Sequence, residues 1–127
     1  MGSLTRVLAL ATVVAPAHAH AEGGAVELRC SVTFTCTEKA VCDHVAVRQI
    51  FRLEPVRVGP AGDGTFRISH DGISAEATNV TPTGPLIWTE PGNGQQILSS
   101  LGPATMLWQR RDAAKASVLF LDCDERS

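Results

Sequence analysis

Apolar and polar residues alternate with a period of two along most of the chain, which is the pattern of half-buried β-strands. Between Leu28 and Cys36, apolar residues and cysteines hold the even positions, and polar or charged residues hold the odd ones. No segment keeps the 3.6-residue period of a helix for more than about one turn. The strands that we predict are 28–36, 45–53, 65–70, 73–78, 86–89, 95–101, 104–109 and 117–123.

Turns rich in glycine, proline and aspartate separate these strands. One loop reads GPAGDG, and Asp71 with Gly72 gives a strong hairpin signal. The second strand meets Pro55, and Val56 and Val58 extend it beyond a kink. About eight short antiparallel strands joined in sequence order indicate an all-β fold, either a small closed barrel or a sandwich.

Four cysteines, Cys30, Cys36, Cys42 and Cys123, allow three disulfide pairings. Six residues of strand span about 20 Å, which is too far for a bond between Cys30 and Cys36. A hairpin loop at 37–41 brings Cys42 back to Cys36, so we favour Cys36–Cys42. Cys30–Cys123 then joins the first strand to the last, as closing a barrel requires. The alternative bonds Cys30 to Cys42 and Cys36 to Cys123.

One observation conflicts with the favoured pairing. If Cys36 faces Cys42 directly, the inward residues of the next strand should hold even positions. The apolar residues there hold odd positions instead. A β-bulge near the turn, or Cys42 lying in the loop, would restore agreement. The residues concerned are Val45, Val47, Phe51 and Leu53.

Residues 1–19 have the features of a secretory signal peptide. Arg6 precedes a short apolar run, and the sequence from Ala17 to Ala19 fits a small-residue cleavage site, with Ala17 and Ala21 as alternative cleavage points. The run is too short to span a bilayer, and no later segment is apolar enough to do so. We therefore expect residues 20–127 to form one periplasmic or secreted domain with oxidised cysteines.

The charge of the chain limits the classes of partner. The formal net charge is −2 at pH 7, and no basic cluster occurs. This balance argues against nucleic acid and anionic membrane surfaces as partners. The partner is not identified by the sequence, and a protein of the cell envelope is the class that we consider.

The sequence offers few candidates for catalysis. Ser69, His70 and Asp71 are consecutive, but neighbours on a strand point to opposite faces, whereas a catalytic triad must converge in space. No nucleophile elbow, phosphate loop or HExxH motif occurs. We therefore expect no enzymatic activity and no catalytic residue.

A histidine near the cleavage site is a weak candidate for metal binding. If cleavage follows Ala19, His20 becomes the N-terminal residue, and its amine and ring could hold copper together with His44 or His70. A flexible tail is the more usual setting for such a histidine. The cysteines lack a CxxC pair, which disfavours zinc. We expect neither a metal nor a cofactor.

Trp88, Glu90 and Asp71 are the candidate binding residues. Trp88 is one of only two tryptophans, and the chain has no tyrosine. A tryptophan on a short strand usually packs in the core or at its rim, and less often lines a ligand site. Glu90 and Asp71 stand at predicted turns, where binding residues concentrate.

The layout of the whole mature chain resembles a known family. Besides the signal peptide, it has an early cysteine in LRC at 28–30, a tryptophan strand LIWT at 86–89, a late strand after Gly102 and a terminal LDC at 121–123. This pattern resembles the membrane-bound c-type lysozyme inhibitors, which are small periplasmic eight-stranded barrels. The resemblance implies that a Ser-Gly-x-x-Tyr loop enters the lysozyme cleft. Segment 73–80 stands in the comparable place but lacks that motif and its tyrosine.

Two functions follow as expectations. The first is a non-enzymatic binding or envelope-associated role for a stable disulfide-bonded barrel. The alternative is inhibition of a lysozyme-like cell-wall hydrolase through the turns at 71–72 or 90–94. A likeness of fold alone does not establish function. A structure that shows whether the barrel interior is filled or hollow would be the most informative observation about these two functions.

Overall fold

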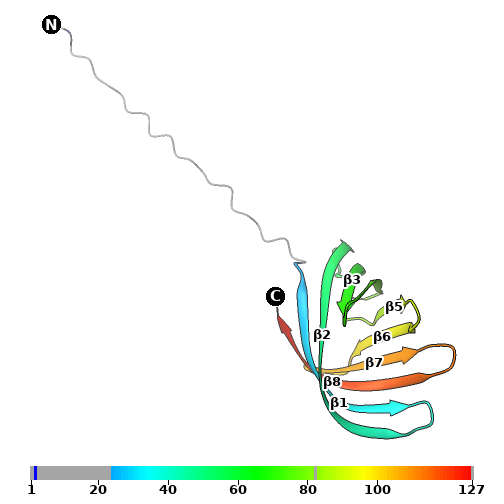
Figure 1. The fold of residues 1–127 in the computed structure, drawn as a ribbon. Helices are drawn as coiled ribbons and strands as arrows, with labels where there is room; N and C mark the ends of the chain where they lie inside the picture. The colour runs from blue at the N-terminus through cyan, green and yellow to red at the C-terminus, as the bar shows by residue number, and fades with distance from the viewer. Residues whose placement is uncertain (1, 3–23, 82, 127) are drawn as a thin grey trace.

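The computed structural model describes Gly2 and residues 24–81 and 83–126, and the chain from Val26 onward forms eight antiparallel β-strands (Figure 1). Every predicted strand is present, with its ends shifted by a few residues. The strands are β1 (Val26–Thr37), β2 (Cys42–Val58), β3 (Gly64–His70), β4 (Ile73–Asn79), β5 (Leu86–Glu90), β6 (Gly94–Ser100), β7 (Thr105–Arg111) and β8 (Ala116–Arg126).

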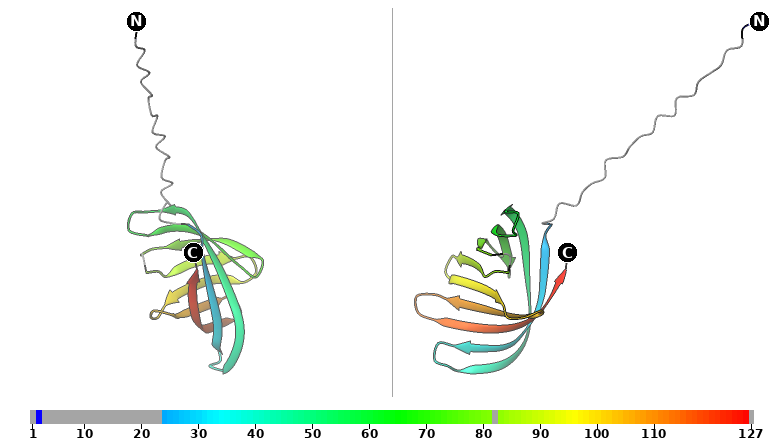
Figure 2. Two further views of the ribbon diagram at one scale, coloured as in Figure 1. Left: turned by 90° about the vertical axis from the view of Figure 1, so that its left-hand side faces the viewer. Right: turned by 180° about the vertical axis from the view of Figure 1, so that it is seen from behind.

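The sheet closes on itself to form a barrel. Each strand pairs with its neighbours in sequence, and β1 also pairs with β8. The predicted closed barrel is therefore confirmed over the sandwich. The tips of the β1–β2 and β7–β8 hairpins lie side by side, where the Glu38 amide donates to the Ala116 carbonyl at 3.0 Å (Figure 2).

Both favoured disulfides are present. Cys30 lies opposite Cys123 on the β1–β8 pair, with 4.0 Å between their Cα atoms. Cys36 lies opposite Cys42 across the first hairpin, with 4.1 Å between their Cα atoms. The first bond therefore fixes the two strands that close the barrel, and the second fixes the tip of the longest hairpin.

A β-bulge in the first hairpin resolves the conflict of positions. Cys36 faces Cys42 and Phe34 faces His44, but Val32 faces Val47. Two residues of β2 therefore stand against one residue of β1, as the predicted bulge requires. Beyond it the inward side chains of β2 hold odd positions, and Phe51 is completely buried.

Two strands extend beyond their alternating parts. β2 continues through Pro55 to Val58, as the expected extension past a kink predicts, with a register shift between Pro55 and Arg57 against β3. β8 continues to Arg126 because its polar end still pairs with the beginning of β1. The alternation marks only the half-buried part of a strand, so it misses paired residues whose two faces are both polar.

The hairpin signal at residues 71 and 72 is also confirmed. Asp71 and Gly72 have φ angles of 48° and 76°, as a two-residue turn of the type favoured between twisted strands requires. Asp71 tolerates this left-handed conformation better than most residues. The turn places His70 and Ile73 opposite each other.

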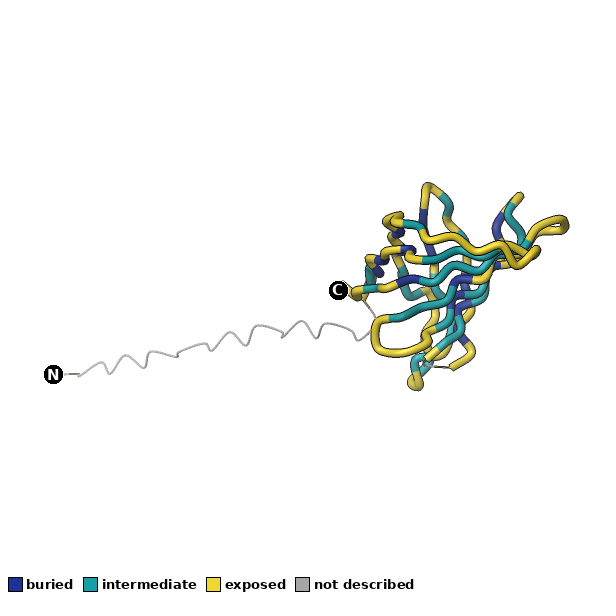
Figure 3. Tube along the Cα trace, turned by 90° about the horizontal axis from the view of Figure 1, so that it is seen from below, coloured by how far each residue is buried: buried dark blue, intermediate teal, exposed yellow. Residues whose placement is uncertain are grey.

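The core lies inside the barrel, where the inward residues of all eight strands meet, while the loops are mostly exposed (Figure 3). Its buried apolar members are Leu28, Cys30, Val32, Phe51, Ile68, Ala77, Leu86, Trp88, Leu98, Trp108 and Leu121.

Two features of the predicted N-terminal region are not described by the structure. The signal peptide at 1–19 and His20 lie outside the described residues, apart from Gly2. Within residues 24–81 and 83–126, no helix is long and apolar enough to cross a membrane.

Candidate functional site

The inward side chains form three layers along the barrel axis. β5 contributes one residue to each layer, because Leu86, Trp88 and Glu90 all face inward. They alternate with Ile87 and Thr89. Leu86 belongs to an apolar layer at one end, Trp88 to an aromatic layer in the middle and Glu90 to a polar layer at the other end. The end with the polar layer carries the turns after β1, β3, β5 and β7, and we call it the closed end.

The middle layer is built from rings packed edge to face. The Phe51 ring lies 5.0 Å from that of Trp108 and 6.5 Å from that of Trp88, between centroids. The His70 ring lies 5.1 Å from the ring of Trp108. Aromatic pairs in this geometry contribute about 0.5–1.5 kcal/mol beyond the area that they bury. The layer therefore fills the middle of the barrel with rigid side chains.

His70 lies between two carboxylates at the closed end. Its Nδ1 is 2.8 Å from Asp71 Oδ2, and its Nε2 contacts Glu90 Oε1. Ionised carboxylates accept hydrogen bonds but donate none, so both contacts are satisfied only when the ring is protonated and donates from both nitrogens. Gln49 Nε2 also donates to Asp71 Oδ2 at 2.9 Å. Each ring nitrogen of His70 therefore lies against a carboxylate oxygen, and the ring is held from both sides.

Glu90 is the centre of this polar layer. Its side chain has no exposed surface, and Trp88 Nε1 donates to its Oε1 at 2.8 Å. Its Oε2 accepts from Asn93 Nδ2 at 3.3 Å and lies 3.9 Å from an Arg110 nitrogen. Burial acts to raise the pKa of Glu90, but the hydrogen bonds from Trp88 and His70 outweigh it and lower that pKa below its usual 4.5. The carboxylate is therefore ionised at neutral pH.

Arg110 and Gln96 complete the closed end. Trp108 Nε1 and Arg110 Nε both donate to Gln96 Oε1, at 2.9 Å and 3.2 Å. The Arg110 guanidinium also stacks over the Trp108 ring, 4.4 Å from its centroid. Gln96 Nε2 donates to the Asn93 carbonyl at 3.0 Å. The network ties the turns after β3 and β5 to β6 and β7.

The serine, histidine and aspartate of 69–71 do not form a triad. Ser69 faces outward, and its hydroxyl donates to Ser74 Oγ at 3.4 Å. His70 faces inward, as the alternation predicts. Asp71, which we expected on the opposite face from His70, instead contacts it, because the left-handed turn at Asp71 directs its carboxylate back over the barrel end.

The three predicted binding residues meet at the closed end. Trp88 and Glu90 are joined by a hydrogen bond, and Asp71 is linked to Glu90 through His70. Trp88 and Glu90 are almost fully buried, whereas 63% of the Asp71 side chain is exposed. Hydrogen bonds from His70 and then Gln49 lower the pKa of Asp71 below its usual 3.8. Only Asp71 of the three is open to a partner.

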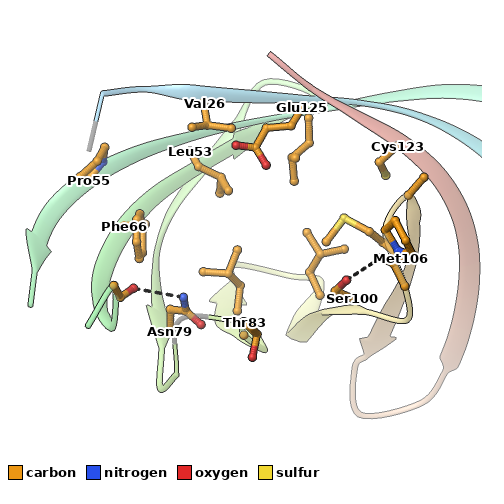
Figure 4. A pocket seen from close by; sticks show the side chains of 18 of the residues that line it. Val26, Leu53, Pro55, Phe66, Asn79, Thr83, Ser100, Met106, Cys123 and Glu125 are labelled. Atoms are coloured by element: carbon orange, nitrogen blue, oxygen red, sulfur yellow. Dashed lines mark hydrogen bonds between the residues drawn. The ribbon is translucent and has the colours of Figure 1, made fainter. Parts of the chain in front are cut away.

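The opposite end of the barrel is hollow. A cavity of about 450 Å³ lies above the aromatic layer and opens between the loops after β2, β4 and β6 (Figure 4). We call it the open-end cavity. Its wall is mainly apolar and includes Leu28, Leu53, Phe66, Leu86, Leu98 and Met106. Ligand pockets of folded proteins have volumes of about 300–1,000 Å³ and similar walls.

Two polar side chains stand out in this wall. Asn79 at the end of β4 is only 8% exposed, and its Nδ2 donates to the Gly62 carbonyl at 3.5 Å. Its buried Oδ1 has no hydrogen-bond partner among the described residues. Glu125 of β8 directs its carboxylate into the cavity from the opposite wall (Figure 4). The cavity thus combines an apolar body with two acceptors.

Sequence reasoning missed both of these residues. Glu125 continues the inward alternation of Leu121 and Cys123, and Asn79 continues that of Ala75 and Ala77. The signal was a polar residue at an inward position. It was overlooked because the predicted strands end at 78 and 123, which is one position before Asn79 and two positions before Glu125.

No group of three or more metal-ligating side chains occurs among residues 24–81 and 83–126. His44 packs its ring against Phe34, 4.7 Å between centroids, and both nitrogens of His70 face carboxylates. The copper site considered for either histidine needs His20, which lies outside the described residues.

No family model, curated protein or solved structure matches this chain.

Proposed function

We propose that this protein is a non-enzymatic binding protein that holds a small, mainly apolar molecule in the open-end cavity. The observation that carries the proposal is the cavity itself, about 450 Å³ of space inside an otherwise filled barrel. An eight-stranded barrel is wide enough either to be filled by side chains or to hold one small ligand. Here one half is filled and the other is open.

The closed end supports this role by making the binding site rigid. The aromatic layer and the Glu90 network join β2, β3, β5, β6 and β7 at one end, and Cys30–Cys123 fixes the seam beside the cavity. A wall that is fixed before binding loses little conformational entropy when the ligand enters. The hydrophobic effect then favours transfer of an apolar ligand from water into the cavity.

The compartment that we propose is the periplasm or the exterior of the cell. Two disulfides that engage all four cysteines are compatible with an oxidising location outside the cytoplasm. The signal-like segment at 1–19 supports export. The intact mass of protein recovered from the periplasm would test the cleavage, with retention of Met1 contradicting it.

A fluorescence titration tests the binding function. N-phenyl-naphthylamine, an uncharged apolar fluorophore, should bind the protein saturably at one site. Met106→Trp, which adds bulk to the cavity wall, should weaken this binding strongly. Ile50→Trp, on the exposed outer face of β2, adds the same ring outside the barrel and should leave it unchanged. Absence of saturable binding, or equal loss in both variants, would reject the proposal.

Inhibition of a lysozyme-like hydrolase remains the alternative, supported by the exposure of Asp71 at the closed end. Its weakness is Glu90, whose side chain is buried and unavailable to a partner. An assay of cell-wall lysis by a c-type lysozyme decides between the functions. Protection by the protein that is lost in Asp71→Ala would favour the inhibitor, and unchanged lysis would exclude it for that enzyme.

A further inference from the structure

The side chains of the open-end cavity wall include two groups with free acceptor oxygens. The Ser100 hydroxyl already donates to the Gly102 carbonyl at 3.0 Å. Thr81 donates its hydroxyl to the Gly84 carbonyl, so Thr83 is the donor in the 3.4 Å contact between the two threonines. What remains in the lining side chains is the Asn79 amide, with an unpartnered Oδ1 and a second hydrogen on Nδ2, and the Glu125 carboxylate.

The charge of the wall has one sign. Among the described residues, Glu125 is the single charged residue that lines the cavity, and it is exposed at the cavity wall. Glu125 forms no salt bridge with a described residue, whereas the nearby Glu27 pairs with Arg29 at 2.6 Å. The outer face of the same strands carries the arginines, beside Asp124. The cavity therefore presents a negative group without an internal counter-ion.

Asn79 gives a second and independent observation. A buried acceptor without a partner costs about 1–3 kcal/mol relative to a satisfied one, and such groups in native proteins need an explanation. Its side chain is more than nine-tenths buried and belongs to the cavity wall. A ligand that brings an N–H or O–H to Oδ1 would satisfy it.

From these contacts we infer that the cavity selects ligands with an apolar body and a cationic, hydrogen-donating head, such as alkylamines. This inference rests on the proposed binding function. The apolar body fills the space among Leu53, Phe66 and Met106, and the head meets Glu125 or Asn79. Fatty acids of equal length are disfavoured, because their carboxylate would share the cavity with the like-charged carboxylate of Glu125.

Competition with the bound fluorophore tests this selectivity. Octylammonium, octanol and octanoate have the same apolar chain and differ only in the head. At neutral pH, octylammonium should displace N-phenyl-naphthylamine at a concentration about two- to five-fold lower than octanol, as a partly exposed ion pair allows. Octanoate should be the weakest competitor. Equal displacement by all three would overturn the inference while leaving the binding function intact.

Variants of one strand assign the effect to Glu125. Glu125→Gln should remove the preference for octylammonium over octanol, and Glu125→Lys should reverse the order so that octanoate binds best. Asp124→Asn makes the same charge change one residue away on the outer face and should preserve the wild-type order. A preference that survives Glu125→Gln, or that is lost equally in Asp124→Asn, would contradict the assignment.

A comparison of two ligands on the wild-type protein tests the role of Asn79 without a substitution that could disturb folding. Methyl octyl ether has the chain of octanol but no donor, so on the wild-type protein it should compete about two- to ten-fold more weakly than its apolar surface predicts. Asn79→Leu should remove that deficit while the fluorophore still binds. An ether that competes as its apolar surface predicts would contradict the role of Asn79.

Discussion

His70 and Glu90 are in direct contact inside the barrel, with Nε2 against Oε1 and with the two side chains 2% and 0% exposed. Taking two charges out of water is costly, and their attraction compensates only when the geometry and the additional hydrogen bonds are good. Here Trp88, Asn93 and Asp71 supply those bonds. The pair therefore depends on the whole closed end.

Removal of one partner should destabilise the protein strongly. His70→Ala leaves the Glu90 carboxylate buried without its partner His70, so the free energy of unfolding should fall by about 3–5 kcal/mol. Urea unfolding followed by tryptophan fluorescence measures this change. Arg52→Ala, which breaks the exposed Arg52–Glu54 pair of 2.8 Å, is the control and should cost less than about 1 kcal/mol.

The double variant His70→Phe with Glu90→Leu distinguishes a paired charge from simple packing. It removes both charges and fills the space with apolar side chains, so it should be more stable than His70→Ala. The single variants His70→Phe and Glu90→Leu complete the comparison. If their losses of unfolding free energy add up to the loss in the double variant, His70 and Glu90 are not coupled and our interpretation of the network is wrong.

Stability should decline in acid because of the same network. The pKa values of Glu90 and Asp71 are lower in the folded protein than their usual 4.5 and 3.8. Carboxyl groups of this kind stabilise the fold fully above their unfolded pKa, and that contribution is lost as the pH falls through the folded pKa. Urea midpoints should therefore be level near neutrality and decline below about pH 4.5.

Glu90→Gln provides the comparison for this pH dependence. The variant should be less stable near neutral pH and should lose less further stability between neutral pH and acid than the wild type. Glu54→Gln, whose carboxylate is exposed, should follow the wild-type curve. Parallel curves for wild type and Glu90→Gln would show that Glu90 does not contribute.

Local patterns predicted the strands and the hairpins because these depend on neighbours in sequence. The alternation from Leu28 to Cys36 and the turn at Gly72 are examples. Cys30–Cys123, which joins the first strand to the last, was predicted instead by excluding pairings that the length of a strand does not allow. The inconsistency of odd and even positions left two predicted solutions, a bulge near the turn or Cys42 in the loop, and the structure has the bulge between Val32 and Phe34.

The open-end cavity could not be predicted in this way. Alternation tells which side chains face inward, but empty volume depends on how inward residues of eight strands fill one space. Leu53, Phe66 and Met106 leave space, whereas Phe51, Trp88 and Trp108 fill it, although both sets follow the same pattern. The contact of Asp71 with His70 was missed because it depends on a single left-handed φ angle.

Two glycines in the β5–β6 turn should respond differently to a methyl group. Gly92 and Gly94 both have positive φ, 78° and 72°. A Cβ at Gly92 meets nothing within 4 Å, but at Gly94 it would lie 2.0 Å from the Arg111 carbonyl oxygen. Gly92→Ala should cost about 1–2 kcal/mol from backbone strain. Gly94→Ala adds overpacking and should cost about 1–3 kcal/mol more, measured by urea unfolding.

The two disulfides should differ in their contribution to stability. Cys30–Cys123 spans 93 residues of sequence and Cys36–Cys42 spans 6. On the loop-entropy model, this difference makes the longer bond more stabilising by about 2 kcal/mol. Cys30 is also buried beside the cavity, so its replacement leaves a space that the core must tolerate. Replacing Cys30 and Cys123 by alanine should therefore cost more than replacing Cys36 and Cys42.

The same pair of variants tests whether the seam between β1 and β8 shapes the binding site. Cys123 lines the open-end cavity, whereas Cys36 and Cys42 lie at the tip of the first hairpin. Loss of Cys30–Cys123 should thus lower both the unfolding midpoint and the affinity for N-phenyl-naphthylamine, because β1 and β8 are then less firmly fixed to each other at the cavity wall. Loss of Cys36–Cys42 should change the midpoint slightly and the affinity not at all. Equal effects on affinity would mean that the barrel wall is held by its hydrogen bonds alone.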